Sequence, residues 1–134
     1  MAATAASSLP RILVVDDEPL LRTFNADMLS DAGFEVLEAS DACEALRLLE
    51  TIQDIQVVFT DVEMPGQIDG FALAKCIEAR WPRIGVLVTS GRRYPLETFA
   101  APARSFVPKP FRVDDVIALI SDVMRESIRP SAVA

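Results

Sequence analysis

The sequence predicts an α/β protein in which five parallel strands form one doubly wound sheet, with a shortened or irregular fourth helix. Short apolar segments alternate along the chain with longer segments of helical periodicity, and this order favours parallel strands joined by helical crossovers. The chain has 134 residues, enough for one domain. Its 51% apolar and 25% charged residues are typical of a globular protein with a buried core.

The first strand is predicted at residues 11–15, and the first helix follows it closely. This largely apolar run ends at two aspartates, after which Glu18 and Pro19 open a helix, because proline is well accommodated in a first helical turn. Gly33 is placed to close this helix as a left-handed cap. The residues that follow the helical repeat, and that we expect in the core, are Leu20, Leu21, Phe24, Met28 and Leu29.

The next two units repeat this order of strand and helix. Residues 34–39 form a strand, and Ser40 or Asp41 caps the helix that follows. Residues 55–60 form the third strand, and the helix beyond it begins at residues 69–70. The inward-facing residues of these two helices are Ala42, Ala45, Leu46, Leu49, Phe71, Leu73, Ala74, Ile77 and Ala79.

The last part of the chain is predicted to hold two more strands, at residues 85–88 and 105–107, and an amphipathic helix at residues 113–128. Two prolines leave only residues 96–101 for a helix between these strands. We therefore expect one short helical turn or two there, in place of a full fourth helix.

The domain is expected to span residues 11–128, between flexible tails at residues 1–10 and 129–134. The start of the chain has no basic stretch leading into a long apolar run, and no run of about 18 apolar residues occurs anywhere. These features predict a cytoplasmic protein. The net charge of −7 predicts no binding to nucleic acids and none to anionic membranes.

The chain has no histidine, which excludes histidine-based nucleophilic catalysis, histidine metal ligands and phosphohistidine formation on this chain. Its two cysteines, Cys43 and Cys76, fall within apolar helical patterns, and we expect both to be unpaired core residues in a reducing compartment. Any chemistry must therefore come from carboxylates, hydroxyls and amines.

Five polar residues stand where strands of the predicted sheet end. Asp16 and Asp17 follow the first strand, and Asp61 follows the third. Ser90 follows the fourth strand and Lys109 the fifth. Because parallel strands end at the same edge of a sheet, these side chains are expected to meet where α/β proteins bind ligands. Each pair of like charges about 4 Å apart costs about 4 kcal/mol, so a cation must lie among the three carboxylates.

These side chains predict a magnesium site that handles phosphate. Carboxylate oxygens without histidine or cysteine favour Mg²⁺, which keeps several waters and binds phosphate oxygens. Lys109 adds a positive charge, and the Ser90 hydroxyl adds a hydrogen-bond donor beside a nucleophilic carboxylate. Taken singly, each residue has an ordinary explanation as a cap, turn or loop residue. Together at one edge of the sheet they are the components for phosphoryl transfer to an aspartate.

Several segments of the chain also resemble a known family. They are residues 12–19, 58–66, 69–70, 88–91 and 107–111. On these segments the chain resembles the receiver domains of two-component response regulators, which have a (βα)5, flavodoxin-like fold. The resemblance implies a stand-alone receiver, a signalling domain rather than an enzyme, monomeric or weakly dimeric. A sensor histidine kinase or a phosphotransfer protein would donate the phosphoryl group, and an unknown downstream protein would bind the product or take the phosphoryl group onward.

The resemblance further implies roles for individual residues. Asp61 would accept the phosphoryl group. Asp17 and Asp61 would bind Mg²⁺ directly, together with the backbone carbonyl of Glu63, while Asp16 would act through water. Lys109 would pair with the phosphoryl oxygens.

The switch hydroxyl implied by the resemblance is either Thr89 or Ser90. Two glycines bracket Ser90 in the family's register, and this favours Ser90. Phe106 matches the aromatic switch position, although it is equally well explained as a core residue. The spacing from Ser90 to Lys109 is shorter than is usual in the family, which puts the usual fourth helix in doubt.

Two other functions stay open at this point. The segment after Gly91 is atypical, so a receiver-like domain that signals without phosphorylation is one alternative. The acidic pattern at Asp61 and Glu63, after a strand, also fits an aspartate-nucleophile phosphohydrolase, although the chain has no substrate cap. If the chain is phosphorylated, Glu63 and Arg92 are expected to flank the path of the attacking water and to tune the lifetime of the phosphoryl group.

Overall fold

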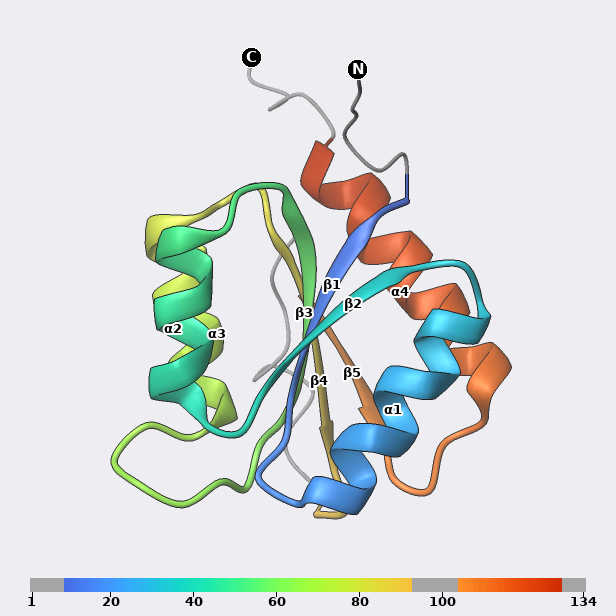
Figure 1. Ribbon diagram of the computed structural model, residues 1–134, viewed down its shortest axis with the longest axis horizontal. Helices are drawn as coiled ribbons and strands as arrows, with labels where there is room; N and C mark the ends of the chain where they lie inside the picture. The colour runs from blue at the N-terminus through green and yellow to red at the C-terminus, as the bar shows by residue number, and fades with distance from the viewer. Residues whose placement is uncertain (1–8, 93–103, 129–134) are drawn as a thin grey trace.

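The computed structural model describes residues 9–92 and 104–128, which form one five-stranded parallel sheet covered by helices on both faces (Figure 1). The strands lie in the order β2-β1-β3-β4-β5. This is the flavodoxin-like order, in which the direction of winding reverses between β1 and β3. The predicted fold class is therefore confirmed. The strands are β1 (Arg11–Val15), β2 (Glu35–Ala39), β3 (Ile55–Asp61), β4 (Gly85–Ser90) and β5 (Arg104–Pro108).

Helices α1 and α4 cover one face of the sheet, and α2 and α3 cover the other (Figure 1). The side chains of β1 alternate between the two faces. Ile12 and Val14 join the apolar cluster under α1 and α4, whereas Leu13 and Val15 join the cluster under α2 and α3. Strand β4 is buried along its whole length. The helices are α1 (Pro19–Asp31), α2 (Ala42–Thr51), α3 (Gly70–Arg80) and α4 (Val113–Ile128).

Two of the central strands end later than the sequence indicates. Strand β3 includes Asp61, and β4 continues to Ser90. The ladder continues because the N–H of Val62 donates to the carbonyl of Thr89 and the N–H of Lys109 donates to the carbonyl of Ser90, each at 3.0 Å. The predicted acceptor and switch residues therefore stand on the sheet itself. The short helix predicted at 96–101 and most of both predicted tails lie outside the described residues.

Helix α1 has the predicted ends. It begins with Pro19, and Gly33 follows its last turn with a φ of 101°, in the left-handed region that favours glycine. The N–H of Gly33 donates to the carbonyl of Ser30, and the N–H of Phe34 donates to that of Leu29, each at 3.1 Å. These two bonds form a Schellman motif, which satisfies carbonyls that the helix leaves open.

The first turns of α1 are exposed, contrary to the predicted core face. Leu20, Leu21 and Phe24 have exposed fractions of 82%, 44% and 54%. Leu21 and Phe24 border a pocket of about 400 Å³ that Asp16 and Lys109 also line, so they do not pack on the sheet. Periodicity predicts the helix, but it cannot tell that these turns reach the edge where the strands end. The residues that α1 does bury are Asn25, Ala26, Met28 and Leu29.

The two cysteines are free thiols, and the prediction of a core position is wrong for Cys43. Cys43 is exposed on α2, and Cys76 on α3 is half-buried. Helix α2 turns Ala42, Ala45 and Leu49 toward the sheet. Cys43 lies one position beyond Ala42, and a residue one position along a helix points in a different direction.

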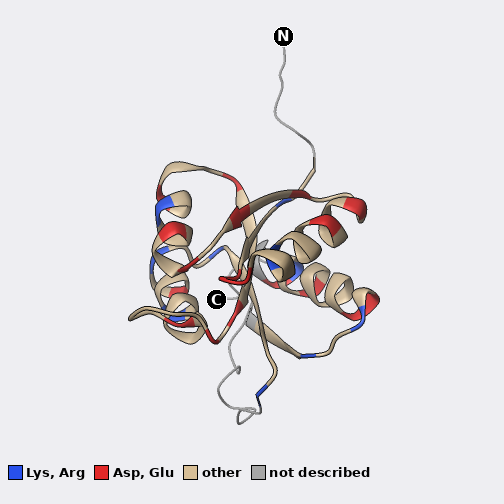
Figure 2. Cartoon of the chain, turned by 60° about the horizontal axis from the view of Figure 1, so that its bottom comes forward, with Lys and Arg blue, Asp and Glu red and all other residues tan. Residues whose placement is uncertain are grey.

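Charges of both signs are distributed over the helices on the two sides of the sheet (Figure 2). In this view the basic positions of the coloured chain are scattered singly, and acidic positions are more frequent, in keeping with the net charge of −7. Within the described ranges, no helix has both the length and the apolar character that crossing a membrane requires.

Helix α2 begins with a cap that can be tested by substitution. The N–H of Glu44 donates to Asp41 Oδ1 at 2.8 Å, and Glu44 accepts from the N–H of Ser40 at 2.7 Å. The bond from the Ser40 backbone is the main reason why the pKa of Glu44 is lowered. We expect Asp41→Ala to reduce the free energy of unfolding by about 1 kcal/mol in urea denaturation. Asp41→Asn keeps a side-chain oxygen that can accept the bond, so its free energy of unfolding should fall far less. An equal loss in both variants would contradict the role of Asp41 as the cap.

Candidate phosphoacceptor site

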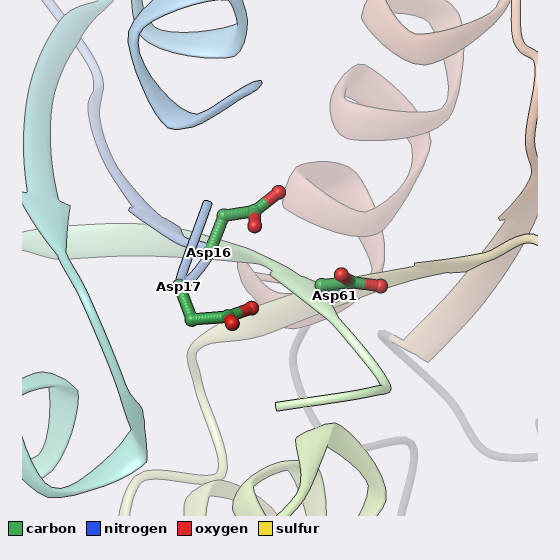
Figure 3. Close-up of side chains that lie close together, drawn as sticks. All are labelled: Asp16, Asp17 and Asp61. Carbon is green, nitrogen blue, oxygen red and sulfur yellow. The ribbon is translucent and has the colours of Figure 1, made fainter. Parts of the chain in front are cut away.

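Three carboxylates meet at the carboxyl edge of the sheet (Figure 3). Asp16 and Asp17 follow β1, and Asp61 ends β3, the strand next to β1. One oxygen of each carboxylate lies within 4.8 Å of the other two. Asp16 and Asp61 are buried, whereas Asp17 is exposed. The point where the winding reverses thus brings together three residues that the sequence predicts as metal ligands.

The turn after β1 holds Asp16 through one oxygen of its carboxylate. The N–H of Glu18 donates to Asp16 Oδ1 at 2.9 Å, so the side chain folds back on its own turn. Arg22 of α1 donates to the backbone carbonyl of Asp16 at 2.9 Å and pairs with Glu38 of β2 at 3.3 Å. Burial raises the pKa of Asp16, although the bond from Glu18 works against the shift.

Lys109 brings a positive charge to the third carboxylate. Its Nζ lies 3.4 Å from Asp61 Oδ2, and its backbone N–H donates to the carbonyl of Ser90 at 3.0 Å. The peptide bond between Lys109 and Pro110 is cis. Burial raises the pKa of Asp61, because the loss of hydration outweighs the favourable field of Lys109. The ion pair therefore compensates the buried charge only in part.

Unpartnered oxygens in this cluster fit a divalent cation. Among the residues that the structure describes, Asp16 Oδ2 and Asp61 Oδ1 are buried and have no hydrogen-bond partner. Buried carboxylate oxygens are seldom left in this state. Hard oxygen donors suit Mg²⁺, which needs one or two carboxylates and fills its other positions with water or phosphate. The donor set therefore fits the predicted metal, while the assignment of each ligand stays a prediction.

The two candidate switch hydroxyls have different partners. Thr89 Oγ1 donates to the carbonyl of Val107 at 2.8 Å, in the buried seam between β4 and β5. Ser90 Oγ lies 2.8 Å from both carboxylate oxygens of Glu63 and accepts from the N–H of Arg92 at 3.0 Å. The Ser90 hydroxyl thus faces the loop after β3, whereas the Thr89 hydroxyl is hydrogen-bonded to the backbone of β5. This placement favours Ser90 as the hydroxyl that reaches a ligand.

Phe106, the predicted aromatic switch, is half-buried on β5 beside Val88 and packs against the cluster under α2 and α3. This position agrees with a core residue, and the switching role stays a prediction. Phe111 follows the loop of Lys109 and packs edge-on against Phe59, with ring centroids 5.9 Å apart. The loop that carries Lys109 is therefore anchored in the core.

The sequence does not predict the contacts of two residues that support the site. Arg22 reads as an ordinary surface residue of an amphipathic helix, yet it ties α1 to the turn after β1. Gly70 begins α3 after its cap Asp69, and a Cβ at this position would lie 2.2 Å from the carbonyl oxygen of Asp61. The N–H of Gly70 also donates to the carbonyl of Val62 at 2.8 Å. A glycine at a helix start gives no signal of such a close approach.

Comparison with known proteins defines the class of this domain. The model of the response regulator receiver domain matches residues 12–121. The transcriptional regulatory protein PhoP of Escherichia coli is 35% identical over 121 residues, which cover 87% of this chain and 53% of PhoP. The chain belongs to the receiver domain family of two-component response regulators. It spans about half, or less, of the length of the curated relatives it matches.

Solved structures agree with this assignment. A response regulator receiver protein from Sinorhizobium medicae has a TM-score of 0.80 and 27% identity, covering 90% of this chain and 98% of that one. The response regulator TrrA of Thermotoga maritima, in complex with Mg²⁺ and BeF, has a TM-score of 0.76 and 30% identity, covering 86% and 99%. Receiver domains are signalling domains that bind Mg²⁺ at an acidic pocket and interact with histidine kinases or phosphotransfer proteins.

Proposed function

We propose that Asp61 accepts a phosphoryl group from the phosphohistidine of a partner kinase or phosphotransfer protein. The supporting observation is the environment of its carboxylate. Oδ1 is buried without a hydrogen-bond partner among the described residues, while Oδ2 lies 3.4 Å from Lys109 Nζ. A nucleophilic carboxylate needs an available oxygen and a nearby cation that draws in the phosphate. These 134 residues contain no histidine, so the donor imidazole lies outside them.

The transfer exchanges one bond to phosphorus for another. An oxygen of Asp61 forms a bond to phosphorus while the bond between phosphorus and the donor imidazole breaks, and the imidazole keeps the electron pair and takes up a proton. Lys109 holds the oxygens of the phosphoryl group, and Ser90 donates a hydrogen bond to one of them. Water later hydrolyses the acyl phosphate and restores Asp61.

The acidic cluster supports this chemistry through the metal that it would hold. We assign Asp17, Asp61 and the carbonyl of Glu63 as direct ligands and place Asp16 behind a water. When bound, Mg²⁺ supplies positive charge to the oxygens of the phosphoryl group. The bond from the Glu18 N–H holds the carboxylate of Asp16 in position.

Phosphorylation would act as a signal by changing charge at one edge of the sheet. The product carries about 1.5 to 2 negative charges, by analogy with other phosphoryl groups, and three acceptor oxygens. They lie beside Ser90 and Lys109, which are already joined by a backbone hydrogen bond across the ends of β4 and β5. A shift of Ser90 toward the product therefore alters both strand ends, and the altered surface binds a downstream protein or hands on the phosphoryl group. The stand-alone arrangement stays a prediction.

Incubation with acetyl phosphate and Mg²⁺ tests the proposal by intact-protein mass spectrometry. We expect the wild-type chain to gain the mass of one phosphoryl group and Asp61→Asn to gain none. Asp27→Asn, which removes an exposed carboxylate from α1, is the matched control and should label like wild type. Unlabelled wild-type protein that also fails to bind beryllofluoride would point to a domain that signals without phosphorylation. Steady turnover of small phosphate esters would instead favour a phosphohydrolase.

Separate substitutions distinguish the two neighbouring hydroxyls. Thr89→Val removes a buried bond to the Val107 carbonyl and should reduce the free energy of unfolding by about 1 kcal/mol, with little effect on beryllofluoride affinity. Ser90→Ala should weaken beryllofluoride binding by less than the roughly tenfold value of one hydrogen bond to a charged group, because Ser90 gives up its bond to Glu63 when it binds the ligand. Denaturation and fluorescence titration measure the two effects. The reverse pattern would identify Thr89 as the switch.

A further inference from the structure

We propose that the carboxylate of Glu63 is a latch that holds the Ser90 hydroxyl in an off position, and that this bond must break before Ser90 can bind a phosphoryl group on Asp61. The inference rests on the proposed function of Asp61. It adds a specific inhibitory contact within the same site, built from the side chain two positions after the acceptor.

The contact follows from the register of the two central strands. Asp61 pairs with Thr89, and the N–H of Val62 donates to the Thr89 carbonyl at 3.0 Å. Glu63, which follows Val62, and Ser90, which follows Thr89, are therefore carried to the same edge of the sheet. There, both carboxylate oxygens of Glu63 lie 2.8 Å from Ser90 Oγ.

The Ser90 hydroxyl has no spare capacity for a second acceptor. A hydroxyl has one proton, and Ser90 donates it to Glu63. Its oxygen accepts the N–H of Arg92 at 3.0 Å, so it is held from the following loop as well. Ser90 has an exposed fraction of 0%, and bulk water cannot replace Glu63 as its partner without a local opening. A phosphoryl oxygen must therefore compete directly with the Glu63 carboxylate for this proton.

This competition has a defined energetic consequence. Hydrogen bonds to an ionised acceptor are roughly twice as strong as those between neutral groups. When Asp61 is phosphorylated, Ser90 exchanges its bond to Glu63 for a bond to the phosphoryl group. The strength of the Glu63 bond therefore sets what fraction of the molecules makes this exchange. Glu63→Gln keeps the shape of the side chain but weakens the hydrogen bond that it accepts from Ser90. The charge of Glu63 also repels an incoming anion, and the experiment has to separate this effect from the latch.

A double-mutant cycle on beryllofluoride binding makes that separation. The proteins are wild type, Glu63→Gln, Ser90→Ala and the double variant, titrated with beryllofluoride in Mg²⁺. With Ser90 present, we expect Glu63→Gln to tighten binding about fivefold. In the Ser90→Ala background the same change should tighten binding by clearly less, because only the repulsion between Glu63 and the anion is removed and no latch remains to be weakened. Glu50→Gln, which removes a carboxylate paired with Arg80 on the surface, should leave affinity unchanged in both backgrounds.

Nuclear magnetic resonance of the ligand-free protein gives a second readout. The N–H of Arg92 reports on Ser90 Oγ directly, and in Glu63→Gln its resonance should move toward its position in beryllofluoride-bound wild type. Equal tightening in both backgrounds, or an Arg92 resonance that does not move, would overturn the latch and leave the role of Asp61 standing. Failure of wild type to bind beryllofluoride would contradict the proposed function, and the latch with it.

Discussion

Gly70→Ala is expected to reduce the free energy of unfolding by about 3 kcal/mol or more, an effect at the upper end for one added methyl group. The new Cβ would stand 2.2 Å from the carbonyl oxygen of Asp61 and 2.7 Å from the Cα of Val62. Both contacts are with backbone, so no side chain can turn aside to relieve them. Helix α3 or the end of β3 has to move.

The same substitution should also impair the site, because the displaced backbone carries the acceptor. We expect weaker binding of beryllofluoride and slower labelling by acetyl phosphate in whatever fraction of Gly70→Ala remains folded. Gly91→Ala is the matched control, since an added Cβ there meets nothing within 4 Å and the backbone needs no positive φ. That variant should lie within about 0.5 kcal/mol of wild type in urea denaturation. Similar losses in both variants would contradict the close approach.

Asp61→Asn is expected to stabilise the protein by about 1 to 2 kcal/mol at pH 7 without divalent ions, although it abolishes labelling. The carboxylate of Asp61 is buried, one of its oxygens is unpartnered, and Asp16 lies beside it. The amide removes one of the repelling charges. Adding Mg²⁺ should reverse the order of stability, because a metal at about 100 times its dissociation constant adds about 2.7 kcal/mol to a protein that binds it. Thermal melts with EDTA and with Mg²⁺ measure both effects.

The pH dependence provides an independent check on this buried charge. Burial raises the pKa values of Asp16 and Asp61 above the ordinary value of 3.8, so the folded protein binds their protons more tightly than the unfolded chain does. Their contribution to stability is fully present below that value and is lost as pH rises through the raised pKa values. Asp61→Asn should therefore show a smaller loss between acid and neutral pH. Asp27→Asn should follow wild type, and an unchanged slope in Asp61→Asn would contradict the prediction.

The fold and the shape of the site could be predicted because each depends on local patterns. Apolar runs predicted every described strand, and proline, glycine and aspartate predicted the helix ends at Pro19, Gly33 and Asp69, while Asp41 was one of two candidate caps beside Ser40. The convergence of carboxylates followed from one rule, that parallel strands end at a common edge. No side-chain contact was needed for that step.

What could not be predicted depends on contacts between distant segments. Periodicity placed Leu20 and Phe24 on the core face, yet they lie at the edge where the sheet ends. The sequence register favoured Ser90 over Thr89 without excluding either, and their different hydrogen bonds, to Glu63 and to Val107, separate the two. The charge of Glu63 was apparent in the sequence. That it binds the neighbouring hydroxyl depends on the register between β3 and β4.

The complete burial of β4 determines which part of the sheet opens last. Its amides, and those of β3 beside it, should be among the last to exchange their hydrogens with heavy water, because opening them requires disruption of the central sheet. Ser90 is the last residue of this slow-exchanging strand. When the Ser90 side chain moves toward a ligand, we therefore expect Gly91 and Arg92 to move with it while the hydrogen bonds of β4 stay intact.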